Sequence, residues 1–215
     1  MSRFSEILKA ECADDWHASV NHRFVKEIFA GTLDDAHLRR YLVQDYQFVD
    51  RFVALLGAAI ASADQFAARV RLSQFAAMIT SDENTYFIRC FDALGVPETD
   101  HHAPALERIT RDFQELMREA ADSRRYASAL AVLCVAEGLY LDWADRPERP
   151  RPERFEHAEW IELHANDLFR KFVGWLRSEL DRMGTLISPS EKEEARRFFH
   201  RAVRLERAFF DMVYA

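Results

Sequence analysis

Three carboxylates interrupt apolar helical faces in this sequence, where a buried charge costs several kcal/mol unless something pairs with it. In the segment RRYLVQDYQFVDRFV, residues 39–53, Asp45 lies at the centre of such a face. The apolar residues around it are Tyr41, Leu42, Phe48, Val49, Phe52 and Val53. Glu206 interrupts the apolar face of the last helical segment, and Glu137 lies in a segment, residues 129–141, that is otherwise uncharged.

A single buried acid is usually satisfied by an arginine, a tyrosine hydroxyl or a helix N-terminus, and each of the three fits that explanation alone. Most arginines of this chain, however, fall on polar faces. Three acids on three apolar faces therefore favour a shared polar pocket that binds a cationic or amine-bearing ligand, binds a metal, or transfers protons. Asp82 and Glu83, in TSDENTYF, either line this pocket or face solvent.

A helical di-iron carboxylate site is the sharpest alternative, and it requires Glu-x-x-His pairs on two helices. Only one of the eight histidines, His101, has a glutamate three residues before it, Glu98. That pair lies in GVPETDHH, a turn containing glycine and proline, and has no second copy. We therefore expect no metal and no other cofactor in the pocket.

Helical periodicity recurs almost throughout the chain, whereas the alternation typical of strands never persists. The sequence predicts an all-α single domain over residues 1–215, a bundle of about eight helices without internal repeats. The expected helices cover residues 3–13, 17–30, 34–63, 66–94, 103–121, 124–145, 155–183 and 190–214. The apolar character of residues 127–142 places that segment at the centre of the fold.

Composition narrows the class of protein. The chain of 215 residues is 49% apolar and 30% charged, with a net charge of -7 and interspersed signs, so we expect no nucleic-acid partner. Residues 1–15 do not resemble a signal peptide, and no run approaches the roughly 20 apolar residues of a membrane span. Three cysteines without C-x-x-C spacing argue against a disulfide framework and a zinc site. A cytoplasmic protein is the expectation.

The ordered motifs resemble one family. DDWHASVNHRFVKEIFAGTLDDAHLRRYLVQDYQFVDRF, LYLDWAD and the closing LERAFFDMVYA are similar to the TenA/thiaminase II proteins, and the resemblance covers essentially the whole chain. It implies a haem-oxygenase-like helical fold and a homo-oligomer, a tetramer or a dimer. It also implies hydrolysis of thiamin or, more physiologically, of its degraded aminopyrimidine fragments, which releases hydroxymethylpyrimidine for salvage.

By position, the resemblance implies that Asp45 and Glu206 hold the aminopyrimidine and that Tyr140 lies near the reactive carbon. A buried carboxylate can accept from the exocyclic amine while another shares a proton with a ring nitrogen. Phe48 or another aromatic residue can stack on the ring.

The departures from the family pattern concern the catalytic positions. Ala136 stands where the cysteine-dependent members carry their nucleophile, and Cys134 lies roughly 200° around the helix from it. Phe48, Phe113 and His164 stand where that class usually has tyrosines. The sequence therefore resembles the cysteine-lacking branch, with Glu137 as the candidate replacement.

The predicted function is an aminopyrimidine hydrolase of thiamin salvage, which acts on aminomethyl- or formylaminomethyl-pyrimidine by carboxylate-assisted water attack. Glu206 and Glu137 are the expected catalytic residues, with Asp45, Phe48, Phe113, Tyr140 and His164 binding the substrate. Two alternatives are a different small-molecule enzyme on the same fold, such as an oxidase or another amine hydrolase, and a protein that binds a heterocycle without turnover.

Overall fold

The computed structural model describes residues 3–215, and every element assigned in that range is helical, which confirms the predicted all-α class. A five-residue π-helical turn, Ile79–Glu83, joins two of the α-helices. The α-helices are α1 (Phe4–Glu11), α2 (Ala13–Val20), α3 (Arg23–Ala30), α4 (Asp35–Ser62), α5 (Phe66–Met78), α6 (Asn84–Leu94), α7 (Glu98–His102), α8 (Arg108–Asp122), α9 (Tyr126–Ala144), α10 (Phe155–Leu163), α11 (Asp167–Leu186) and α12 (Pro189–Met212).

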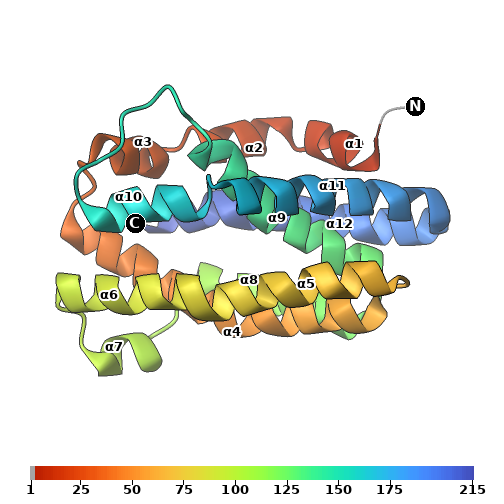
Figure 1. The fold of residues 1–215 in the computed structure, drawn as a ribbon, viewed down its shortest axis with the longest axis horizontal. Coiled ribbons are helices and arrows are strands. Elements are labelled where there is room, and N and C mark those ends of the chain that lie inside the picture. Colours follow the sequence, from red (N-terminus) through yellow and green to blue (C-terminus); the bar gives the residue numbers. More distant parts are fainter. Residues whose placement is uncertain (1–2) are drawn as a thin grey trace.

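The helix α9 occupies the centre of the bundle. Figure 1 shows it running obliquely between the layer of α4, α5 and α6 and the layer of α11 and α12. It packs against α12, α11, α4, α8 and α2. Sixteen of its 19 residues are buried, which explains why a helix long and apolar enough to cross a membrane belongs here to the protein core. Its polar residues Ser128, Glu137 and Tyr140 are therefore buried within the protein.

Three expected helices are interrupted in the structure. Residues 17–30 divide between α2 and α3, where the ring of His22 accepts a hydrogen bond from the Phe24 amide. Residues 155–183 divide between α10 and α11, where Asn166 donates to the carbonyls of Glu162 and Leu163 and accepts from the Phe169 amide. Residues 66–94 contain the π-helical turn. The apolar pattern continues across all three breaks, because the flanking helices share one core.

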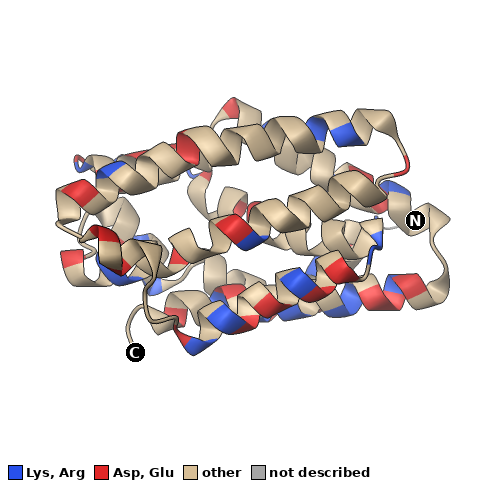
Figure 2. Ribbon diagram, turned by 90° about the horizontal axis from the view of Figure 1, so that it is seen from below, with Lys and Arg blue, Asp and Glu red and all other residues tan. Residues whose placement is uncertain are grey.

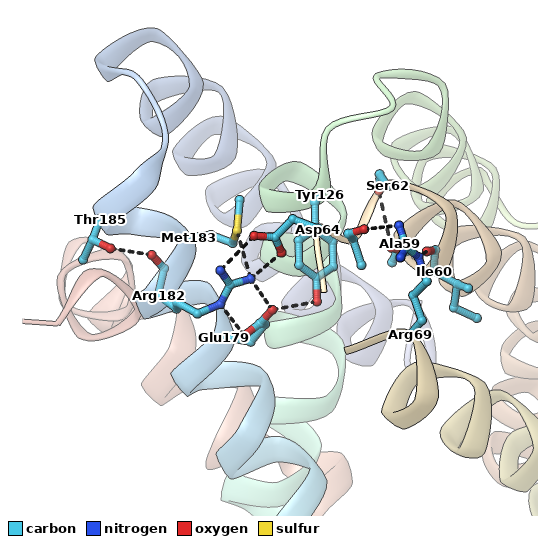
Figure 3. A network of polar contacts seen from close by, with 11 residues as sticks. Ala59, Ile60, Ser62, Asp64, Arg69, Tyr126, Glu179, Arg182, Met183 and Thr185 are labelled. Atoms are coloured by element: carbon cyan, nitrogen blue, oxygen red, sulfur yellow. Dashed lines mark hydrogen bonds and ion pairs between the residues drawn. The ribbon is translucent and has the colours of Figure 1, made fainter. Parts of the chain in front are cut away.

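A buried acid outside the centre of the fold has the ordinary partners. Glu179 of α11 pairs with Arg182 and accepts a hydrogen bond from the Tyr126 hydroxyl at 3.1 Å (Figure 3). Arg182 also binds Asp64 after α4, so the network joins α9, α11 and the α4–α5 connection. Charged residues elsewhere alternate in sign along the outer helices (Figure 2). Glu179 thus shows how this chain satisfies a buried acid that has a structural role.

Candidate active site

One cavity lies inside the bundle, against the middle of α9. It encloses about 70 Å³, on the scale of one small heterocyclic ring and well below the roughly 300–1,000 Å³ of drug-sized sites. Its walls come from α4, the π-helical turn, α8, α9, the end of α10 and α12. The structure brings together all seven residues that the sequence singled out for the site: Asp45, Phe48, Phe113, Glu137, Tyr140, His164 and Glu206.

Four carboxyl groups line this cavity, and each comes from a different element. Asp45 belongs to α4, Glu83 to the π-helical turn, Glu137 to α9 and Glu206 to α12. Glu137 and Glu206 are buried, at 7% and 3% exposure. Among residues 3–215, no lysine or arginine lines the cavity or forms an ion pair with any of the four. The site therefore lacks a fixed cation to balance its acids.

Burial dominates the electrostatics of these acids. It raises the pKa of Asp45, Glu137 and Glu206 well above their ordinary values and the pKa of Glu83 to about 7. Mutual repulsion adds to this effect: Glu83 raises the pKa of Asp45, and Asp45 raises the pKa of Glu206. The acids of the cavity therefore retain protons near neutral pH, and a cationic or hydrogen-bonding ligand would release some of them.

A tyrosine pair connects two of the walls. The hydroxyl oxygens of Tyr41 on α4 and Tyr140 on α9 are 2.7 Å apart, and both side chains are buried. The Tyr41 hydroxyl also lowers the pKa of Asp45, which opposes the effect of burial on that carboxyl. Burial and the nearby acids raise the pKa of Tyr140, so its hydroxyl keeps its proton and remains a donor. The pair joins α4 to α9 on the side of the cavity that carries Asp45.

His164 closes one side of the cavity as a neutral ring. Its Nδ1 lies 2.8 Å from the carbonyl oxygen of Trp160, which can only accept, so Nδ1 carries the hydrogen and Nε2 is left as an acceptor. Burial lowers the pKa of His164 to about 4. The ring centre lies 4.8 Å from that of Tyr140. This histidine therefore contributes an acceptor rather than a positive charge.

Aromatic side chains form the apolar walls. Phe48 contacts Phe113 and Phe209 with ring centres at 5.2 and 4.8 Å, and both Phe48 and Phe113 line the cavity. A flat, uncharged ring can pack against such walls, and the four carboxyl groups can form hydrogen bonds with the polar edge of that ring. Acids at the edge and phenyl rings on the faces match the polarity of a small nitrogen heterocycle.

Glu83 is the site residue that the sequence left undecided. The π-helical turn directs Glu83 and Ile79 to the cavity, whereas the adjacent Asp82 is exposed and lines outer hollows. A π turn inserts a residue into a helix and rotates the residues after it, and helical periodicity does not reveal this change. The useful signal was the acid pair itself, next to a segment expected to face the core.

The structure also shows what lies at the position that corresponds to the cysteine nucleophile of the family. Ala136 lines the cavity, and none of the three cysteines does. Cys134 is buried elsewhere on α9, where burial raises the pKa of its thiol and keeps it protonated. No set of three His, Cys, Asp or Glu side chains within residues 3–215 has an arrangement that would hold a metal ion.

Comparison with known proteins shows which family the chain resembles. The sequence profile of the TENA/THI-4/PQQC family matches residues 10–215. The protein belongs to this family. Its curated relatives include the aminopyrimidine aminohydrolases of Halalkalibacterium halodurans, 23% identical over 98% of this chain and 95% of that protein, and of Helicobacter pylori, 24% identical over 98% of both.

Solved TenA structures share the fold. A TenA homologue from Pyrococcus furiosus superimposes with a TM-score of 0.88 at 21% identity, over 98% of this chain and 100% of that one. The expected haem-oxygenase-like all-α architecture is thereby confirmed. At this identity the likeness establishes the fold, and the chemistry has to be argued from the cavity.

Proposed function

We propose that this protein is an aminopyrimidine hydrolase that cleaves the exocyclic carbon–nitrogen bond of aminomethyl- or formylaminomethyl-pyrimidine and releases hydroxymethylpyrimidine. The observation that carries the proposal is the convergence of Asp45, Glu137 and Glu206, from three helices, on one small cavity with Tyr140. The family and the curated names of its relatives support it.

Recognition follows from the chemistry of the walls. A 4-aminopyrimidine presents an amine donor and basic ring nitrogens along one edge, and carboxyl groups can accept from the first and share a proton with the second. In this scheme Asp45 accepts from the amine, and Glu206 shares a proton with a ring nitrogen. Phe48 and Phe113, which contact each other, provide an apolar wall for the ring.

Turnover requires a group that activates water. Glu137 lies one residue from Ala136 on the wall of the cavity, and its pKa is raised by burial and by the neighbouring acids. A carboxyl with a raised pKa is suited to general acid–base work near neutral pH. In the proposed reaction the bound amine-bearing substrate leaves Glu137 ionised, and Glu137, assisted by Glu206, takes a proton from a water molecule as the water oxygen bonds to the exocyclic carbon and the amine leaves.

The direct test is product formation by purified, chelator-treated protein supplied with aminomethyl- and formylaminomethyl-pyrimidine. Hydroxymethylpyrimidine should appear with wild-type protein, and Glu206→Gln should form it at least 100-fold more slowly. Binding of the pyrimidines without turnover would replace the hydrolase with a binding protein. Neither binding nor turnover would reject the pyrimidine altogether.

The cytoplasmic location and the homo-oligomeric state, a dimer or a tetramer, belong to the same proposal. Light scattering of the purified protein measures the second directly, and a strictly monomeric particle would contradict it.

A further inference from the structure

A second hollow lies outside the cavity and shares two residues with it. It encloses about 190 Å³ and contains Glu83 and His164, which also line the inner cavity. Its other walls come from the end of α5, the π-helical turn and the beginning of α11 (Figure 1). Glu83 and His164 therefore stand at the boundary between the two spaces.

The outer hollow has an apolar part that can receive a small neutral group. Met78, Leu163, Leu168 and Phe169 form this part, Asp82, Asn166 and Asp167 complete the wall with Glu83 and His164, and no lysine or arginine among residues 3–215 lines it. Leu168 is 70% exposed, so the hollow communicates with solvent. The inner cavity, by contrast, is scarcely larger than one ring. A ligand with a ring and a substituent needs both spaces.

Glu83 has no structural role that would explain its position. No hydrogen bond or ion pair to its side chain occurs within the described chain, in contrast to Glu179, which has Arg182 and Tyr126. Burial alone raises the pKa of Glu83 to about 7, so near neutral pH the carboxyl can both hold and give up a proton. An unpaired carboxyl in such a position costs stability, and functional sites are where such costs are retained. The π-helical turn that directs it inward is a feature common at functional sites.

We propose that Glu83 donates a proton to the leaving nitrogen and that the outer hollow receives the substituent on that nitrogen. This inference rests on the proposed hydrolase function and assigns its leaving-group side. The ring lies inward against the wall that Phe48 and Phe113 form, and the scissile bond points to the boundary at Glu83. The preferred substrates are then 4-amino-5-aminomethyl-pyrimidines whose nitrogen carries a small neutral group, such as formyl or an apolar substituent.

The reaction balances with water as the only co-reactant. The water oxygen bonds to the exocyclic carbon, and its proton passes to Glu137. The carbon–nitrogen bond breaks, its electron pair stays on nitrogen, and the Glu83 carboxyl supplies the proton that completes the neutral amine or amide. Glu137 then returns its proton to solvent and Glu83 regains one through the outer hollow, so the net reaction consumes only one water molecule.

The first experiment compares leaving groups that need the proton to different degrees. An aminomethyl group can leave as ammonia from its already protonated form, whereas a formylamino group must be protonated as it leaves. Glu83→Gln should therefore lower kcat for the formylated substrate about 10²–10⁴-fold, and much less for the free amine. Affinity for hydroxymethylpyrimidine should stay within about twofold of wild type. Asp92→Asn, an exposed acid on α6, is the matched control and should change neither substrate.

The second experiment fills the outer hollow. Leu168→Trp changes an exposed residue, so the fold should tolerate it. It should lower kcat/KM for an N-benzylaminomethyl-pyrimidine at least tenfold and leave the unsubstituted amine within about twofold.

The outcomes separate this inference from the function beneath it. Wild-type protein that turns over no pyrimidine overturns both. If the wild type is active and Glu83→Gln lowers kcat by the same factor for the formylated substrate and the free amine, the assignment of Glu83 as proton donor is wrong and the hydrolase function stands. Wild-type turnover of the benzyl substrate that Leu168→Trp does not slow overturns the assignment of the hollow.

Discussion

The hydroxyl oxygens of Tyr41 and Tyr140 lie 2.7 Å apart, and the Tyr41 hydroxyl lowers the pKa of Asp45. The pair joins α4 to the central helix α9, and Asp45 lies at the cavity wall next to it. Because both hydroxyls are buried, removing one leaves the other groups without a replacement from solvent.

Tyr41→Phe tests the importance of that arrangement. The change removes the hydroxyl that bonds Tyr140 and lowers the pKa of Asp45, and we expect the affinity for hydroxymethylpyrimidine to fall by roughly 5–10-fold, the scale of about 1 kcal/mol for one hydrogen bond. Isothermal calorimetry of product binding measures it. Tyr46→Phe removes a hydroxyl that donates to Asn84 outside the cavity and should bind product as wild type does. Equal affinities for wild type and Tyr41→Phe would show that Asp45 does not need this partner.

The four acids also predict how stability depends on pH. Burial raises their pKa values, so the folded protein binds more protons than the unfolded chain, and stability falls as pH rises through the folded-state values. For Glu83 this loss spans the interval from its ordinary pKa to about 7. His164 acts oppositely, because its lowered pKa of about 4 makes stability rise with pH only up to its ordinary value of 6.5.

Above pH 6.5 His164 no longer contributes to the pH dependence of stability, so the acids of the cavity determine its direction. Between pH 6.5 and 8 we expect the free energy of unfolding of the ligand-free protein to fall, measured by urea denaturation. Glu137→Gln should lose less over the same interval, since one of the buried groups no longer ionises. Glu153→Gln, at an exposed position, should follow the wild-type curve. A wild-type protein that becomes more stable toward pH 8 would contradict the prediction.

The sequence predicted the helical class from its periodicity and the three acids of the cavity from their place on apolar faces, whereas Phe48, Phe113, Tyr140 and His164 came from the family resemblance. A charge on an apolar helical face is visible in the order of residues, and Asp45, Glu137 and Glu206 each carry that signal. Their assembly into one cavity is visible only in the structure, because it depends on how α4, α9 and α12 pack. Helix breaks at His22 and Asn166 were missed, since their side-chain caps leave the apolar pattern intact.

Glu83 marks the limit of the same reasoning. Helical spacing assigns a face only while the helix keeps 3.6 residues per turn, and the π-helical turn changes that register. The sequence could therefore state that Asp82 and Glu83 were candidates, and the structure was needed to separate them.

Catalysis should not depend on a thiol. Cys134 is absent from the cavity wall, and its buried thiol stays protonated, whereas a reactive cysteine is a thiolate. Cys134→Ala should therefore keep pyrimidine hydrolysis within about twofold of wild type, measured as product formed under saturating substrate. The larger cost is expected in stability, because a small cavity opens in the core. A hundredfold loss of activity in a folded variant would make Cys134 the nucleophile.

The last prediction separates binding from chemistry among the carboxylates. Asp45 is proposed to accept from the pyrimidine amine, and a lost hydrogen bond to a charged group costs about 1.5–3 kcal/mol. Asp45→Asn should therefore weaken product binding by roughly 10–150-fold. Glu137 is proposed to act on the water, and losing a general acid–base costs about 10²–10⁴ in rate.

Glu137→Gln should consequently bind hydroxymethylpyrimidine as wild type does and lose kcat. The two variants are compared under one set of conditions by product affinity and by kcat, with Glu153→Gln as the surface control. Since glutamine keeps the shape of Glu137 and removes only its ability to exchange a proton, intact binding with lost turnover has a single chemical meaning. If Glu137→Gln turns over normally, the proton transfer from water belongs to Glu206, and Glu137 is a residue of the cavity wall.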